Sequence, residues 1–296
     1  MLKKISVVDA TIDSLINLKQ SIITDYQLGM IIFCLYTNQQ YKNYPLRVKN
    51  KFPKKNDYKR ILEILLNKGL LKNTENIKTA FYINDIIKIP INELLCSLDP
   101  FCYISHLSAM QFYGFINKEI NIHYCTSPSL EEWKKLCLEK INIDSFKNLN
   151  QYLATDFPLL THPKNISQNI ICYSTSRLGK FNFFNYKKVR VSTIGRVFLD
   201  MLRKSEFCGG LETVINVFKQ FAKPNLNYIL DEIDEFGSQI EKVRAGYILE
   251  EICKIDNNEI INKWTENIQR GGSRKLDPSK SYSPTYSSKW CISINY

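Results

Sequence analysis

The sequence predicts an α+β protein built from two domains, a small one over residues 1–95 and a larger mixed α/β one over residues 96–296. Two observations support this division. In the first third, apolar residues recur at helical spacing and give way to a short pattern typical of paired strands. Pro90 and Pro100 then interrupt the chain, and a longer mixture of helical and strand patterns follows. A chain of 296 residues is long enough for two hydrophobic cores.

The first domain is expected to begin with two helices, over residues 11–19 and 25–39. The second of these carries apolar residues at 28, 31, 32, 35 and 36, which is the spacing of one buried helical face. Thr24 or Asp25 is suited to cap its N-terminus, because a short polar side chain accepts a hydrogen bond from the first turn.

A third helix and a hairpin are expected next. The helix should begin near Asn56 or Asp57, both suitable N-caps, and end at Gly69, since glycine is favoured just after a helix. The segment 70–83 then predicts two short strands joined by a polar tip over residues 73–76.

Helices followed by a basic helix and a hairpin are the order of a winged helix-turn-helix domain. In that fold the last helix enters the major groove, where its polar side chains meet base edges. Cations around the helix and on the wing hold phosphates and set the register. The DNA-binding candidates are Arg47, Lys49, Lys54, Lys55, Asn56, Lys59 and Arg60, together with Lys72 and Lys78 on the wing.

The charge distribution agrees with a polyanionic partner. The chain holds 40 Lys and Arg against 29 Asp and Glu, a net charge of +11. Residues 41–60 alone hold eight bases and one acid, a net of +7. A basic protein suits nucleic acid or an anionic membrane surface, and a solvated lysine-rich loop is the plainer alternative. Because this charge lies beside the third helix, DNA binding is favoured over the alternative that this small domain binds a protein or has no partner.

The second domain is expected to mix short strands with helices. A helix capped by Ser105 should run to Gly114, and Thr193 should open another through Leu202. Strands are expected over residues 120–125, 170–174 and 189–192, further helices over 211–221, 226–235 and 238–255, and a final strand over 290–294 after a polar stretch that begins at Gly271.

Several segments of this domain resemble one known family. They are Tyr103–Gly114 (Y-I-S-H-L-S-A-x-x-x-Y-G), Val191–Gly210 (V-S-T-I-G-R-V-F-L-D-M-L-R, then G-G), Arg244–Leu249, and the closing Leu276-Asp277-Pro278 with Lys289-Trp290, Ile292 and Asn295. In this order and spacing they are similar to AbiEi-type antitoxins, the regulators of AbiE type IV toxin–antitoxin systems. The resemblance covers most of residues 55–296, and the basic insert over residues 41–55 departs from the simplest members.

The resemblance implies a function for each domain. The winged helix would bind inverted repeats upstream of its own operon, as a monomer or a dimer on DNA, and repress transcription. The C-terminal domain would act as an antitoxin in phage defence, opposing a nucleotidyltransferase-like toxin without forming a stable complex with it.

The residues that could do chemistry do not form a recognisable active site. Ser105 and His106 are adjacent at a helix start, where their side chains are expected to point apart, so Ser105 is interpreted as an N-cap and His106 as a buried hydrogen-bonding residue. Arg196 and Asp200 are four apart on one helix and predict an ion pair. Arg190 and Arg196 are the candidates for a charged surface of this domain. The acidic run 231–235 is expected to be solvated.

The remaining composition excludes other classes. Nine scattered cysteines without a C-x-x-C pair and three histidines predict no zinc site, no metal and no cofactor. The longest apolar run, Leu28–Tyr36, is far short of the roughly 20 residues of a spanning helix. We therefore expect a non-enzymatic cytoplasmic protein. Two rival hypotheses are a nuclease or nucleotide-modifying domain targeted by the winged helix, and an adaptor whose winged helix meets an acidic protein.

Overall fold

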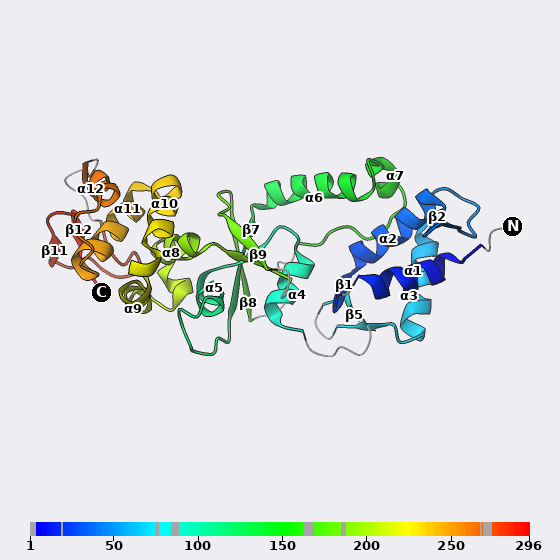
Figure 1. Cartoon of the computed structure of the whole chain (residues 1–296), viewed down its shortest axis with the longest axis horizontal. Coiled ribbons are helices and arrows are strands. Elements are labelled where there is room, and N and C mark those ends of the chain that lie inside the picture. Colours follow the sequence, from blue (N-terminus) through cyan, green and yellow to red (C-terminus); the bar gives the residue numbers. More distant parts are fainter. Residues whose placement is uncertain are drawn as a thin grey trace. The chain divides into compact units, whose positions relative to one another are not determined.

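The computed structural model describes residues 4–18, 20–74, 77–83, 89–162, 169–184, 188–266, 268 and 274–296. The chain is a mixed α/β protein, as expected from the sequence (Figure 1). It divides into two compact units. The first contains Met1–Cys102, Ser127–Gln168 and Ser174–Ser176, and the second contains Tyr103–Thr126, Asn169–Tyr173 and Arg177–Tyr296.

The first unit begins with two capped helices. Helix α1 (Val7–Asn17) starts earlier than predicted, because Ser6 accepts a hydrogen bond from the Asp9 backbone and so caps it. Helix α2 (Asp25–Asn38) confirms its prediction, and Thr24 is the cap. The Thr24 hydroxyl and the Gln27 side chain each bond the other residue's backbone N–H, which satisfies two donors of the helix start.

The first unit also holds a three-stranded antiparallel sheet, in the order β1 (Ile22–Thr24), β5 (Ala80–Ile83), β4 (Leu71–Asn73). The β4–β5 hairpin lies where the sequence predicts it, although residues 75 and 76 of its tip lie outside the described residues. Strand β1 was not predicted. It is only three residues long and all three are buried, so no alternation marks it in the sequence.

Helix α3 runs over Lys55–Asn67 and ends before Gly69, whose φ of 69° is the left-handed conformation that glycine favours. Between α2 and α3 lies a small hairpin, β2 (Gln40–Tyr41) and β3 (Tyr44–Pro45). Its two turn residues both have positive φ, which matches the twist of a tight hairpin.

The first unit extends beyond the predicted boundary at residue 95. Helix α4 (Ile91–Leu98) belongs to it, and so do α6 (Leu130–Asp144) and α7 (Leu149–Leu153) after the chain returns. The reason is aromatic packing. Tyr152 packs edge-on against Phe33 with ring centroids 5.2 Å apart, and Phe157 lies 5.5 Å from Tyr58. These rings complete the core of α2 and α3, so a segment distant in sequence is part of the N-terminal fold.

The second unit is organised around a mixed sheet in the order β8 (Ile170–Thr175), β7 (His123–Pro128), β6 (Tyr103–Ile104), β10 (Val189–Ser192), β9 (Phe181–Phe184). Strand β10 is parallel to β6 and antiparallel to β9. The predicted strands correspond to β7, β8 and β10, and the predicted helix after Ser105 is α5 (His106–Phe112).

Five helices complete this unit: α8 (Ile194–Arg203), α9 (Leu211–Phe221), α10 (Leu226–Phe236), α11 (Gln239–Gly246) and α12 (Glu259–Glu266). The helix predicted over residues 238–255 is not uniform, because α11 passes into a π-helical turn over Tyr247–Ile252. The expected final strand is only Ile292–Ser293 (β12), paired with Tyr286–Ser287 (β11). Gly271, where the polar stretch was expected to start, lies outside the described residues.

Candidate functional site

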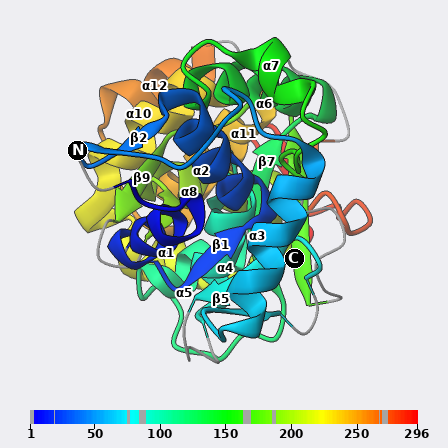
Figure 2. The same ribbon diagram turned by 90° about the vertical axis from the view of Figure 1, so that its right-hand side faces the viewer.

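Helix α3 separates an apolar face from a polar one. Tyr58, Ile61 and Leu65 are buried, while the candidate residues of this helix, Lys55, Asn56, Lys59 and Arg60, are exposed. Figure 2 shows α3 at the front of the first unit, beside α1, α2 and the strands β1 and β5. The helix therefore presents four hydrogen-bonding side chains, three of them cationic, on the side away from its core.

The start of α3 differs from the prediction that Asn56 or Asp57 would be its cap. The N-cap is Lys54, whose side chain makes no cap hydrogen bond. Instead, the Asp57 carboxylate reaches back and accepts from the Lys54 backbone N–H at 2.9 Å. Because Asp57 serves the helix terminus from inside the first turn, the amide of Asn56 is left for an outside partner.

The basic insert is held to the protein by its apolar residues. Leu46 and Pro53 are buried, and Phe52 stacks on Phe33 with centroids 6.1 Å apart. The Arg47 backbone N–H donates to the Ile5 carbonyl at 2.9 Å. The cations between these anchors are exposed. We name the basic ridge as the exposed residues Arg47, Lys49, Lys51, Lys54, Lys55, Asn56, Lys59 and Arg60.

Carboxylates neutralise little of the basic ridge. Arg60 lies 3.8 Å from Asp57 and Lys55 lies 4.0 Å from Asp156, and both pairs are largely exposed. Exposed pairs of this kind contribute little and are screened by salt. Lys49, Lys54 and Lys59 form no ion pair with any residue that the structure describes. The ridge thus keeps most of its positive charge.

The other two candidates lie on the hairpin. Lys72 is on β4, paired in register with Tyr82, and Lys78 precedes β5. Both are exposed. The structure therefore places seven of the nine candidates along one continuous stretch, residues 47–60, and two on the β4–β5 hairpin.

One partly buried hydrogen bond joins α3 to α2. The Tyr58 hydroxyl donates to Asp25 Oδ1 at 2.5 Å. Burial raises the pKa of Asp25, and the Tyr58 hydrogen bond partly offsets this by lowering it. Neither residue was singled out in the sequence, although Asp25 was considered as a cap.

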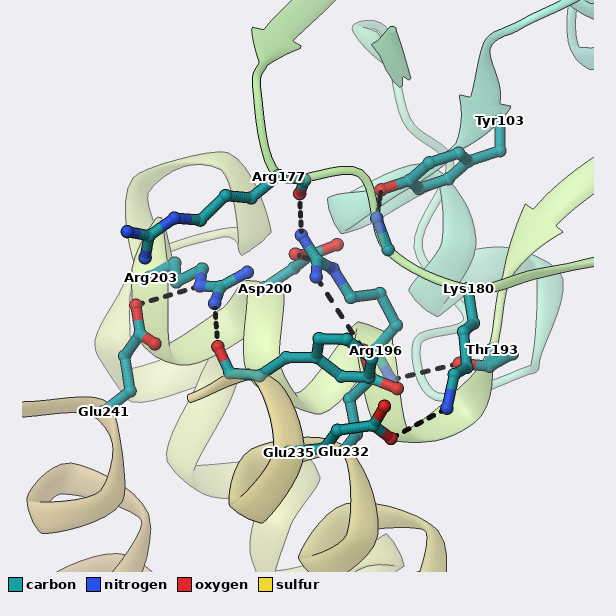
Figure 3. Close-up of polar contacts among 12 residues, drawn as sticks. Tyr103, Arg177, Lys180, Thr193, Arg196, Asp200, Arg203, Glu232, Glu235 and Glu241 are labelled. Carbon is teal, nitrogen blue, oxygen red and sulfur yellow. Dashed lines mark hydrogen bonds and ion pairs between the residues drawn. The ribbon is translucent and has the colours of Figure 1, made fainter. Parts of the chain in front are cut away.

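In the second unit, the structure contradicts the expectation that Arg196 lies on a surface. Arg196 is 3% exposed. Its Nε donates to Asp200 Oδ1 at 2.9 Å, and an Nη atom lies 3.7 Å from Glu232 Oε1 (Figure 3). It also donates to the Arg177 carbonyl at 3.3 Å. The intrahelical ion pair is thus confirmed, and Arg196 acts as a buried tie between α8, α10 and the segment before β9.

Two further sequence interpretations concern Glu232 and Arg190, two other charged residues of the second unit. Glu232 was counted in a solvated acidic run, but only 6% of it is exposed. Its neighbours Ile229 and Ile233 are buried at helical spacing, and this signal could have marked its face. Burial raises the pKa of Glu232, and Arg196 lowers it. Arg190 is half-buried on β10, in register with Phe183.

The Ser105–His106 pair also differs from its prediction. The two side chains do not point apart, because Ser105 Oγ lies 2.8 Å from His106 Nδ1, and Thr126 donates to Ser105 at 2.8 Å. His106 has a φ of 50°, and this left-handed residue alters the helix start. Ser105 occupies the N-cap position without a side-chain cap bond. His106 is buried, as predicted, and Ser105 is 0% exposed.

The last motif segments come together around Trp290. Its indole donates to Glu250 at 2.9 Å, and Arg244 donates to the carbonyls of Lys275 and Leu202 at 3.1 Å each. Asn295 accepts from the Asp277 backbone at 2.8 Å. These residues hold the C-terminal tail to the π-helical turn, so their role in the structure is to fold the tail.

Comparison with known proteins gives one fold-level result. No family model matches this chain, and no curated protein matches it. The chain is similar to the crystal structure of the RV2827C protein from Mycobacterium tuberculosis, with a TM-score of 0.54 over 99% of this chain and 92% of that one. The sequence identity is 8%, so the similarity shows a shared fold and nothing of function.

The described residues were predicted to hold neither a metal site nor a membrane-spanning helix. No group of three His, Cys, Asp or Glu side chains in the described ranges is arranged to hold a metal ion. Among the helices that the structure describes, none is both long and apolar enough to cross a membrane.

Proposed function

We propose that this chain binds double-stranded DNA through its first unit, acting as a winged helix-turn-helix. Helices α1, α2 and α3 would form the helical part, with β1, β4 and β5 as the sheet and the β4–β5 hairpin as the wing. The observation that carries the proposal is the exposed cationic side of α3 together with the insert that leads into it. A solvated loop would not need apolar anchors at Leu46, Phe52 and Pro53.

The ridge residues divide by position into two roles. Asn56, Lys59 and Arg60 are on α3, where an amide suits adenine and a guanidinium suits guanine in the major groove. Arg47, Lys49, Lys54 and Lys55 precede or open the helix and would hold phosphates, with Lys72 and Lys78 on the wing. The Tyr58–Asp25 bond supports this division, because recognition requires a helix held at a fixed angle.

We propose further that the protein is an autorepressor and antitoxin of an AbiE-like type IV system. This rests on the resemblance of the C-terminal segments to AbiEi antitoxins. It gains support from contacts between those segments within the second unit: Val191 pairs with Ile104, Arg244 donates to the Leu202 carbonyl, and the Asp277 backbone donates to Asn295. The partner would be a nucleotidyltransferase-like toxin in the cytoplasm, opposed without a stable complex. We propose a non-enzymatic role, and the burial of the Ser105–His106 pair favours it.

The DNA-binding proposal is tested on the duplex upstream of the protein's own reading frame. We expect Lys59→Ala with Arg60→Ala to weaken binding, because two side chains assigned to base edges in the major groove are removed. Lys134→Ala with Lys135→Ala is the matched control, since it removes the same charge from exposed positions on α6. Equal gel-shift affinity for both double variants would reject α3 as the recognition helix.

The antitoxin proposal needs a separate measurement. Each reading frame that neighbours the gene of this chain is expressed with and without the chain, and growth is recorded to find a toxic product. We expect wild type to restore growth. The Lys59→Ala, Arg60→Ala variant should also restore it when supplied from a foreign promoter, because antitoxicity is assigned to the second unit. Failure of wild type to restore growth would reject the antitoxin role and leave the DNA-binding result standing.

A further inference from the structure

An apolar cavity of about 500 Å³ lies inside the first unit, and the proposed function does not use it. It is open to solvent, and residues of α1, α2, the β2 strand and the end of α6 line it. Cavities of 300–1,000 Å³ are the usual size for small-molecule sites. This cavity is therefore large enough for a ligand rather than for a few water molecules.

The floor of the cavity is one stripe of α2. Gln27, Ile31, Cys34 and Asn38 recur at helical spacing along it, and Met30 and Leu35 flank the stripe. Leu18, the C-cap of α1, and Phe146, after α6, also line the cavity. Phe146 is 69% exposed, so an aromatic ring stands at the edge of the cavity with little protein to cover it. A ligand here would remove apolar surface from water on several sides.

The charges at the cavity cancel within the protein. Lys140 and Asp144 are the charged residues of the described lining, and their side chains pair at 2.9 Å. Asp144 also accepts from the Tyr26 hydroxyl at 2.7 Å. No net charge is left for an ionic ligand to balance, since burying an unpaired charge is costly. Amide groups of Gln20, Asn38 and Gln40 supply hydrogen bonds at the edge.

We infer that this cavity is a binding site for an uncharged, mostly apolar small molecule with one or two hydrogen-bonding groups. The volume of the cavity suits a small molecule, and the paired charges of its lining favour an uncharged one. The inference does not rest on the proposed function, because none of the residues that line the cavity is a proposed DNA contact.

The test uses N-phenylnaphthylamine, an uncharged probe whose fluorescence rises in apolar sites, on the full chain. We expect saturable binding of one probe per chain. Ile31→Trp fills the cavity and should weaken binding by about tenfold or more, as overfilling a packed site does. Ile143→Trp is the matched control, since Ile143 is 72% exposed and outside the lining. Its affinity should equal that of wild type.

A second measurement needs no variant. Alkylation of Cys34 by iodoacetamide, followed by mass spectrometry, should slow when the probe is present, while alkylation of Cys291 should not change. Burial raises the pKa of the Cys34 thiol to about 11, so long reaction times are used. Protection of Cys34 from alkylation shows whether the probe binds in this cavity, even if the Ile31→Trp variant fails to fold.

Four outcomes would overturn the inference. One is the absence of saturable probe binding by folded wild type. Another is probe binding that neither protects Cys34 nor responds to Ile31→Trp. The third is equal competition at this site by anilinonaphthalene sulfonate, which shares the ring system but is anionic. The fourth is protection of Cys34 by self-association alone, seen by sedimentation, which would assign the cavity to a second copy of the chain.

Discussion

Buried Tyr58 of α3 and half-buried Asp25 of α2 share a 2.5 Å hydrogen bond in the first unit. The bond joins the first turns of the two helices. It sets the position of α3 independently of the cations on the other side of that helix. Tyr58 therefore belongs to the buried face of α3, together with Ile61 and Leu65.

Tyr58→Phe should destabilise the protein by about 1–3 kcal/mol, because Asp25 keeps its burial and loses a donor. The loss should depend on pH. Burial already raises the pKa of Asp25, and losing the Tyr58 donor raises it further. A carboxyl with a raised folded-state pKa stabilises the fold below its unfolded pKa and stops doing so as the pH rises through the folded value. The defect should therefore shrink on acidification.

Urea unfolding of wild type and Tyr58→Phe at neutral and acidic pH measures how the stability loss depends on pH. Tyr82→Phe is the control, since Tyr82 is half-buried and no hydrogen bond of its hydroxyl occurs among the described residues. A defect of Tyr58→Phe that grows on acidification would contradict the explanation.

Asn56→Ala and Lys49→Ala should weaken DNA binding in different ways. The first should reduce discrimination at one base pair by about 1–3 kcal/mol, because the amide no longer bonds a base edge. The second should weaken binding to every sequence alike and lower the salt slope by about 0.9. Titrations against a set of single-base operator variants separate the two. Identical profiles would contradict the roles assigned here.

Arg196→Met should destabilise the second unit by about 3–5 kcal/mol, since Asp200 and Glu232 would remain buried without their cation. Adding Asp200→Leu and Glu232→Met should recover much of the loss, because an apolar cluster needs no counter-charge. Thermal unfolding of both variants gives the comparison. Equal destabilisation of the single and triple variants would indicate a packing role for Arg196 instead.

Asp99 should make stability depend on pH. This carboxyl is fully buried and accepts hydrogen bonds from Ser127 and the Trp133 indole, and burial raises its pKa to about 6. Its contribution is complete below the unfolded pKa near 3.8 and is lost as the pH rises through about 6. Asp99→Asn should flatten the melting temperature between pH 4 and 6 relative to wild type. Asp256→Asn, at an exposed position, should not.

Gly246→Ala should loosen the C-terminal tail. An added Cβ would lie 2.0 Å from the Trp290 ring, which is buried and bonded to Glu250. We expect faster proteolysis of residues 274–296 and a red shift of tryptophan emission. The double variant Gly246→Ala, Trp290→Leu should lose less stability than the sum of the losses of the two single variants, because the two residues are in contact. Additive effects would place the strain elsewhere.

Local patterns predict those parts of the fold that local forces decide. The boundaries of α2 and α3 follow from apolar spacing and terminal residues, and β10 and α8–α10 follow in the same way. The prediction for the start of α3 was wrong by one or two residues, because Asp57 caps from within the helix. The basic ridge was foreseen for the same local reason, since its charge lies in twenty consecutive residues.

Packing between distant segments accounts for the remaining differences. Tyr152 packs on Phe33, 119 residues away, and Phe157 packs on Tyr58, 99 residues away, so the first unit extends past the predicted boundary at residue 95. Glu232 and Arg196 appear as exposed charges in the sequence and become buried because α8 and α10 pack together. The Ser105 and His106 side chains come into contact because the His106 backbone has a positive φ.

The sequence by itself determined the two-part order of elements, the helical face of α3 and the concentration of cations before and along it, because helix periodicity and charge are properties of neighbouring residues. The folded chain alone shows which charges stay in water, which segment completes the first core, and where an apolar pocket forms. Those depend on the free energy of packing surfaces that are far apart in the chain, and a one-dimensional pattern does not contain that information.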